Sequence, residues 1–251
     1  GVELDDGSVE LLRRRTEGWP AAVHLAGLSL QDAVDAAEFV GRFAGDDRNV
    51  ADFLIGEALE RVSDRDREFL LRTSVLDQMT GPLCDEVAGV TDGSAMLDRM
   101  ERSGLFLVPL DTTRRWYRYH RLFGDWLRHE LRKTDPAVIP TLHLAAAQWY
   151  AETDSLEPAV DHAIEAGDHL LAARLIDRYL QVWAAVHWSL VWRWFLELSD
   201  DAIRAYHMTA VGRLNVALAR GDFATSSRWL DSAEAALGAV PAELLPTFET
   251  T

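Results

Sequence analysis

One stretch of this chain carries a convincing β signal, and it constrains the fold more than any other feature. In LFLVPLDTTRRWYRY, residues 105–119, an apolar run, a polar turn and an aromatic-rich run follow one another. This order predicts a two-stranded hairpin. The next segment, HRLFGDWLRHELRK, has helical periodicity, and one face of it collects Phe123, Trp126, Leu127 and Leu131. The rest reads as helices, so we expect a mainly α fold with one small β-hairpin.

Three short helices are predicted before the hairpin. Ser63, with Asp66 three residues later, approximates a capping box that begins the first helix. The buried side of this helix is supplied by Phe69, Leu70 and Leu71. GPLCDEVAGV and DGSAMLDRMERSG then read as two helices, each bounded by glycine. Three helices followed by a hairpin is the order of a winged helix.

The N-terminal residues are predicted to be helical as well. Residues 9–30 read as two helices broken at EGWP, where Gly18 interrupts and Pro20 suits the first turn of the second helix. The second helix, AAVHLAGLSL, is apolar on nearly every side, which indicates burial. A further helix is predicted to begin at a cap formed by Asp46 and Asp47. One face of that helix would hold Val50, Phe53, Leu54 and Ala58.

The C-terminal part reads as short antiparallel helices and contains an internal echo. AIEAGDHLLAARLI (163–176) aligns with ALARGDFATSSRWL (217–230), an offset of 54 residues (217 minus 163). In both copies we expect one helix to end at Gly-Asp and another to begin. Stacked helix pairs of this kind share one core, as in TPR-like repeats. The predicted domains are therefore a helical segment at 1–45, a winged helix at 46–135 and a TPR-like helical-repeat domain at 136–251.

The composition argues against several classes of protein. The net charge is −16 and no basic stripe stands out, which argues against nucleic-acid binding by this chain. No apolar run reaches the roughly 18 residues of a membrane-spanning helix, and the acidic N-terminus lacks the features of a signal peptide. The single cysteine, Cys84, suits a reducing cytoplasm. There is no initiator Met, and we expect the chain to be a fragment of a longer protein.

No catalytic or metal-binding constellation is visible in the sequence. The histidines lack HExxH spacing, because Lys133 stands where the second ligand after His129 would be. Cys84 lies on a short apolar helix, where a packed thiol is expected rather than a nucleophile. No glycine-rich phosphate loop of the Walker type is present. We therefore expect no enzymatic activity, no metal and no cofactor in this chain by itself.

A tryptophan cluster near the C-terminus has two interpretations. In VWAAVHWSLVWRWFLEL, Trp188, Trp192 and Phe195 share one helical face, while Trp194 points almost oppositely. Two aromatic faces indicate either a helix sandwiched between neighbours or an exposed aromatic surface. In the second interpretation, Trp188, Trp192 and Trp194 would bind an effector or a protein partner.

Several motifs, taken in order, resemble the central part of the large MalT-like regulators of the LuxR family, which belong to the STAND class of signalling ATPases. They are RTEGWPAAVHLAGLSL, LRTSVLDQMTGPLCDEVAG, MERSGLFLVPLD, WYRYHRLFGDWLRHEL, LHLAAAQWYAE and AVDHAIEAGD, between about residues 15 and 175. The resemblance implies a regulatory segment of an ATP-dependent transcriptional activator. A P-loop ATPase would precede the chain, so that residues 1–45 are its helical lid, and a repeat sensor and a LuxR-type helix-turn-helix would follow.

The same resemblance implies how such a protein works. ADP would hold a closed state, and inducer with ATP would permit self-association and transcription. Partners of this segment would be the ATPase and sensor domains, with a small-molecule inducer or a protein partner at the repeats; DNA would be bound elsewhere in the protein. The alternative is a helical-repeat scaffold or small-molecule sensor module of a non-transcriptional STAND protein.

Two motifs carry over to positions in this chain. EGWPAAV resembles the GLPL-type motif of NB-ARC domains, with Trp19 where that motif has leucine, which implies that Gly18, Trp19 and Pro20 lie near the nucleotide base. YRYHRLF stands in the place of the MHD-type motif, whose histidine contacts the β-phosphate of ADP, and this implies a phosphate contact for His120. Strand alternation puts Trp116, Arg118 and His120 on one side of the strand. His120 would then open a helix, whose N-terminus favours a nearby anion; a structural role in capping that helix or in an interdomain contact is the alternative.

Overall fold

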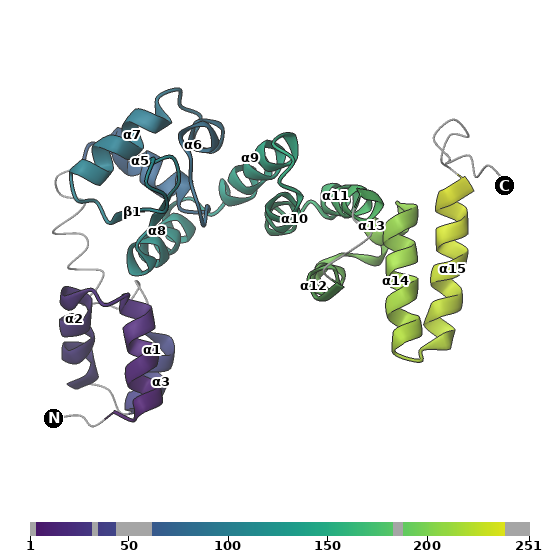
Figure 1. The fold of residues 1–251 in the computed structure, drawn as a ribbon, viewed down its shortest axis with the longest axis horizontal. Coiled ribbons are helices and arrows are strands. Elements are labelled where there is room, and N and C mark those ends of the chain that lie inside the picture. The colour runs from purple at the N-terminus through teal and green to yellow at the C-terminus, as the bar shows by residue number, and fades with distance from the viewer. Residues whose placement is uncertain (1–3, 32–34, 44–61, 183–187, 239–251) are drawn as a thin grey trace. The chain divides into compact units, whose positions relative to one another are not determined.

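The computed structural model describes residues 4–31, 35–43, 62–182 and 188–238, and the chain divides into two compact units, Gly1–Leu142 and His143–Thr251. Figure 1 labels their helices and strands. The fold is mainly α with one two-stranded hairpin among the described residues, which confirms the predicted fold class. The domain boundaries predicted at 45/46 and 135/136 stay predictions. No helix in the described ranges has the length and apolarity that crossing a membrane requires.

The first unit follows the predicted order of elements. Three N-terminal helices are α1 (Asp6–Thr16), α2 (Pro20–Gln31) and α3 (Ala36–Arg42). The winged helix comprises α5 (Asp64–Thr73), α6 (Gly81–Ala88), α7 (Gly93–Arg102), β1 (Leu107–Pro109), β2 (Tyr117–Tyr119) and α8 (Arg121–Thr134). The helix predicted from the Asp46/Asp47 cap, with its face of Val50, Phe53, Leu54 and Ala58, lies outside the described residues.

Local sequence signals explain where these helices begin and end. Ser63 caps α5: its Oγ accepts the backbone N–H of Asp66 at 3.2 Å, as in a capping box, and it donates to the Asp66 carboxylate at 2.9 Å, where a capping box would use the backbone N–H of Ser63. Gly89 ends α6 with φ of 69°, a left-handed conformation that glycine adopts without steric cost. One expectation is wrong. Helix α2 buries Ala22, Ala26 and Leu30, but Val23 is 44% exposed, so this helix is covered on one face only.

The hairpin is short and its alternation is as predicted. Leu107 pairs with Tyr119 and Pro109 with Tyr117 in antiparallel register, and Met79 adds a bridge to Tyr117 on the other edge. Tyr117 and Tyr119 are buried, whereas Arg118 between them is half-buried. The strand therefore turns its two tyrosines to the core and Arg118 to the opposite side.

The core of the winged helix is formed by buried side chains of α5, α6, α7 and α8. The predicted apolar face of α8 is confirmed, since Phe123, Trp126, Leu127 and Leu131 are all buried. Phe69 and Leu70 of α5 are buried as well, and Leu71 is half-buried. A buried hydrogen bond of 2.6 Å between Thr73 Oγ1 and Tyr119 Oη joins α5 to β2. This packing fixes the junction between β2 and α8.

The second unit is built from helix pairs. Its elements are the greater part of α9 (Ile139–Glu152), α10 (Leu156–Glu165), α11 (His169–Val182), α12 (Trp188–Glu197), α13 (Asp200–Arg204), α14 (His207–Ala219) and α15 (Phe223–Gly238). Helix α10 packs on α11, and α14 runs beside α15 (Figure 1).

The two predicted Gly-Asp turns have the same geometry. Gly167 and Gly221 have φ of 75° and 72°. Asp168 and Asp222 then cap the following helices, because each side chain accepts the backbone N–H three residues on, at 2.9 Å and 3.0 Å. The two similar sequence segments therefore form the same helix–turn–helix cap in the structure.

Candidate functional site

His120 lies at the junction of β2 and α8, as its N-cap residue. Its backbone N–H donates to the carbonyl of Phe106 at 2.7 Å, and its own carbonyl accepts the N–H of Gly124 at 2.9 Å. The side chain is 13% exposed. Neither ring nitrogen makes a hydrogen bond with any residue that the structure describes. The backbone of Thr16 and the Glu17 carboxylate are polar neighbours of this ring, so its need for hydrogen bonds is met only in part.

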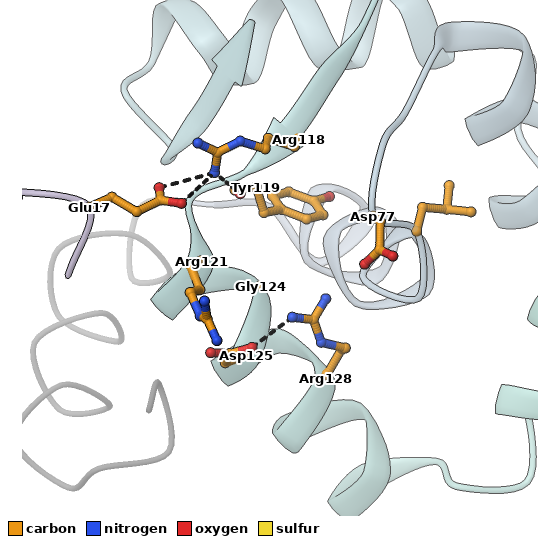
Figure 2. Close-up of a pocket in the computed structure, with 9 residues that line it drawn as sticks. Glu17, Asp77, Arg118, Tyr119, Arg121, Gly124, Asp125 and Arg128 are labelled. Carbon is orange, nitrogen blue, oxygen red and sulfur yellow. Dashed lines mark hydrogen bonds and ion pairs between the residues drawn. The ribbon is translucent and has the colours of Figure 1, made fainter. Parts of the chain in front are cut away.

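The turn between α1 and α2 brings Glu17 to this junction. Glu17 has φ of 49° and Gly18 has φ of 73°, two consecutive left-handed residues that turn the chain sharply. Arg118 Nη1 donates to both carboxylate oxygens of Glu17, at 2.9 Å and 3.0 Å, and to the carbonyl of Tyr119 at 3.1 Å (Figure 2). The second Glu17 oxygen lies 3.5 Å from Nε2 of His120, which is long for a hydrogen bond. We call these three residues the Glu17–Arg118–His120 cluster.

Trp19 fixes the same turn by aromatic packing. Its ring centroid lies 4.9 Å from that of Phe106 and 5.3 Å from that of His120, the second in an edge arrangement. Phe106 itself has φ of 53° and packs on the buried ring of Phe123. The Trp19–Phe106 contact therefore joins two segments that each contain a non-glycine residue with positive φ, Glu17 in one and Phe106 in the other.

Burial lowers the pKa of His120 below its ordinary value of 6.5. The Glu17 carboxylate and, more weakly, the backbone of Thr16 oppose this shift, while Arg118 adds to it. The imidazole is therefore neutral at neutral pH, and its contact with Glu17 is not yet an ion pair. A further anion, or loss of the covering turn, would favour the charged form.

A polar pocket of about 430 Å³ adjoins the cluster (Figure 2). It is lined by Glu17, Leu76, Asp77, Arg118, Tyr119, Arg121, Gly124, Asp125 and Arg128. Arg128 is already engaged, because it donates to Asp125 at 2.7 Å and to the carbonyl of Ser74 at 3.2 Å. Arg121 forms no ion pair with any described residue. The pocket can therefore bind an anionic group through Arg121 and, where Glu17 gives way, through Arg118.

The structure brings together some of the residues predicted from the sequence. Trp19 and His120 are in contact, Gly18 forms the turn that allows it, and Pro20 is exposed at the start of α2. The sequence interpretation missed Glu17 as the partner of Arg118. Glu17 lies in the EGWP motif and Arg118 in YRYHRLF, yet nothing in the sequence joins motifs 101 residues apart.

Of the two interpretations of the tryptophan cluster, the structure supports the core for Trp194 and contradicts the exposed surface. Its side chain is fully buried, its Nε1 donates to Asp161 at 2.6 Å, and its ring packs edge-on against Tyr179. Trp194 is therefore part of the core that joins α10, α11 and α12. The side chain of Trp188 lies outside the described residues.

Trp192 is half-buried and contributes to a groove. The groove has a volume of about 470 Å³ and is lined by Trp192, Asn215, Val216, Ala219 and Arg220. The guanidinium of Arg220 lies 3.7 Å from the centroid of the Trp192 ring, a close cation–π contact. Of Trp192 and Trp194, only Trp192 is partly accessible.

Other candidate chemistry is weak in the described part of the chain. Cys84 is fully buried, and burial raises the pKa of its thiol, which opposes nucleophilic reactivity. No group of three metal-ligating side chains occurs among the described residues. On α7, Arg99 pairs with Asp66 and Arg102 with Asp98, so these cations are engaged within the unit.

Comparison with known proteins finds a winged-helix family model and relatives with similar sequences. The family model described as the MalT winged helix domain matches residues 55–139. The chain is 36% identical to the serine/threonine-protein kinase PknK of Mycobacterium tuberculosis (strain ATCC 25618 / H37Rv) over 178 residues, 71% of this chain and 16% of PknK. It is 38% identical to the HTH-type transcriptional regulator MalT of Klebsiella pneumoniae (strain 342) over 170 residues, 66% of this chain and 18% of that protein. The chain thus spans about a sixth of the length of these curated relatives. With its three helices, short hairpin and matched family model, residues 55–139 of the chain are a MalT winged helix domain.

Proposed function

We propose that this chain is the regulatory middle segment of a longer, ATP-dependent transcriptional activator in the cytoplasm. The MalT winged helix domain and the 38% identity to a MalT regulator support this proposal. An ATPase domain that binds ADP or ATP and a sensor domain would be its intramolecular partners. Inducer and ATP would permit self-association, and another domain would bind DNA. The chain alone would not turn over ATP.

The observation that carries the proposal is the arrangement around His120. A buried imidazole without hydrogen bonds stands at a helix N-terminus, and a single carboxylate from another helical segment reaches toward it. That carboxylate is held by one nitrogen of Arg118, Nη1, which contacts both of its oxygens through charge-assisted hydrogen bonds. The Glu17 carboxylate beside His120 supports the proposal that this position accepts a negative charge, as the phosphate contact implied by the resemblance would require.

The residues fit a phosphate in part. His120, Arg118 and Arg121 would favour it, because one is a neutral donor at a helix N-terminus and two are cations at a polar pocket. Glu17 opposes it, because two anions within a few ångströms of one imidazole repel each other. We infer that Glu17 and the phosphate occupy this position in turn. Exchange between them would couple the nucleotide state to the docking of the α1–α2 turn on the winged helix.

Nucleotide exchange in the longer protein tests this proposal. His120→Ala should speed the loss of ADP and raise basal transcription, because a phosphate contact of the closed state is removed. His24→Ala is the matched control, since His24 is exposed on α2 and away from the cluster. Unchanged ADP exchange together with unchanged basal output would refute a nucleotide-sensing role for His120.

The identity to PknK favours a second candidate function. That relative is named a protein kinase, so a region like this one also occurs in a protein whose name does not denote DNA binding. The chain would then be a helical-repeat scaffold or a small-molecule sensor module in a non-transcriptional protein. The Trp192–Arg220 groove is where a small molecule would be sought. Calorimetry against a panel of sugars and metabolites, with Trp192→Phe as the control, would test the sensor; a flat response would count against it. Sequence following residue 251 in the gene would decide between transcriptional and other outputs.

A further inference from the structure

Two histidines of the second unit meet in a contact that the proposed function does not use. His143 lies on α9 and His162 on α10, and their Nδ1 atoms are 2.9 Å apart. The ring centroids are 5.0 Å apart. At this distance a proton lies between the two nitrogens, so one ring donates and the other accepts. A neutral pair can do this, and so can a pair with one extra proton.

A second extra proton cannot be accommodated. Both Nδ1 atoms would then carry hydrogens pointing at each other, and two positive charges would lie within 3 Å. The ring of Tyr150 on α9 stacks on His162 at 5.6 Å and 17°, and His162 is half-buried. The pair must therefore separate or remain at most singly protonated.

The charged groups of the surrounding helices do not offset a second proton. Asp161, next to His162 on α10, is the nearest acid, but it accepts from Arg193 and from Trp194 Nε1, both on α12. Glu157, one turn earlier on α10, accepts from Tyr179 of α11 at 3.3 Å. Among the charges that act on His162, that of His143 opposes protonation and that of Asp161 favours it. Asp161 and Glu157 are thus committed to other helices.

We propose that the His143–His162 pair is a proton-sensitive contact that holds α9 on α10 while the pair carries at most one extra proton and releases it when both rings are charged. The burial of His162 supports this. Desolvation and the charge of His143 lower the pKa of His162 from 6.5 to about 4, while the unfolded chain keeps the ordinary value. Between these values the unfolded state binds more protons than the folded state, so stability falls as pH falls from 6.5 toward 4. In the steepest part, each pH unit changes the folding equilibrium constant by about tenfold.

Nuclear magnetic resonance of the full chain gives the first test. Imidazole ¹⁵N signals, followed from pH 7.5 to 4, report the tautomer and the titration of each ring without any substitution. We expect unlike Nδ1 states for His143 and His162, and a second titration step displaced well below the ordinary histidine range. Two independent titrations near the ordinary value would overturn the proposal.

Denaturant unfolding of the full chain at pH 7.0 and pH 5.0 gives the second test. His143→Asn places an amide near the Nδ1 position and cannot be protonated in this range. The ratio of the unfolding equilibrium constant at pH 5.0 to that at pH 7.0 should therefore be at least threefold smaller in the variant than in the wild-type chain. His169→Asn on α11 is the matched control, because it removes a histidine of the same unit and leaves the pair intact. Equal acid sensitivity of the wild-type chain and His143→Asn would overturn the proposal. Should His143→Asn fail to fold, the titration of the unsubstituted chain decides alone.

Discussion

Trp194 offers the sharpest test of how the second unit is packed. Its indole is fully buried, with 0% of the residue accessible to water, and it packs edge-on against the ring of Tyr179. Its N–H donates to Asp161 at 2.6 Å, and Asp161 is also held by Arg193 at 2.8 Å and 3.0 Å. Trp194→Phe removes the hydrogen bond and part of the ring while keeping an aromatic side chain in place.

The expected cost follows from these contacts. A hydrogen bond to a charged acceptor contributes roughly 1.5–3 kcal/mol, and the lower end applies here because Asp161 keeps Arg193. Phenylalanine leaves a void of roughly 40 Å³, which at about 24 cal/mol per Å³ adds about 1 kcal/mol. We therefore expect Trp194→Phe to lower the free energy of unfolding by about 2–3 kcal/mol.

Urea unfolding followed by circular dichroism measures this change, and hydrogen exchange of α12 amides assigns it to the second unit. Trp192→Phe on the same helix is the matched control. Its ring is only half-buried and stacks on the exposed Arg220, so a loss below about 1 kcal/mol is expected. A Trp194→Phe variant no less stable than Trp192→Phe would refute the burial of Trp194 and return it to the surface.

Two further substitutions test packing elsewhere. Gly212→Ala would place a methyl group 2.8 Å from the buried ring of Phe195, so differential scanning calorimetry should show a loss of stability of about 1–3 kcal/mol. Its control, Gly27→Ala on an open face of α2, should stabilise the chain by about 0.5–1 kcal/mol. A Gly212→Ala variant more stable than Gly27→Ala would contradict the packing of Gly212 on Phe195. Thr73→Val keeps the shape of the side chain but leaves the buried Tyr119 hydroxyl without its 2.6 Å partner, at a cost of about 1–3 kcal/mol in urea unfolding; no cost would show that this hydrogen bond is dispensable.

Signals that act over a few residues were readable from the sequence. The Ser63 cap, the apolar face of α8 and the alternation along β2 were predicted correctly, because each is decided by neighbours within one or two turns. The Gly167 and Gly221 turns were predicted for the same reason, since only a short left-handed segment followed by a cap is required.

Contacts between distant segments were not readable. The Glu17–Arg118 pair joins residues 101 apart, and a charged residue in a turn carries no mark of the partner it will meet. The His143–His162 pair was missed because two histidines 19 residues apart fit no ligand spacing. A surface position was one option for Trp194 because helical periodicity gives only the direction of a side chain around its own helix. The residues that cover Trp194 lie on α10 and α11, and periodicity does not reveal them.

The central claim is that Glu17 and a nucleotide phosphate exclude each other at Arg118 and His120. The most direct measurement is the dissociation constant of ADP for the longer protein with Glu17→Gln, compared with Glu10→Gln, which disrupts only an exposed pair with Arg13. A partly exposed ion pair contributes about 1 kcal/mol, so removal of the competing charge should tighten ADP binding by roughly fivefold. Binding that is unchanged or weaker in Glu17→Gln would contradict the account.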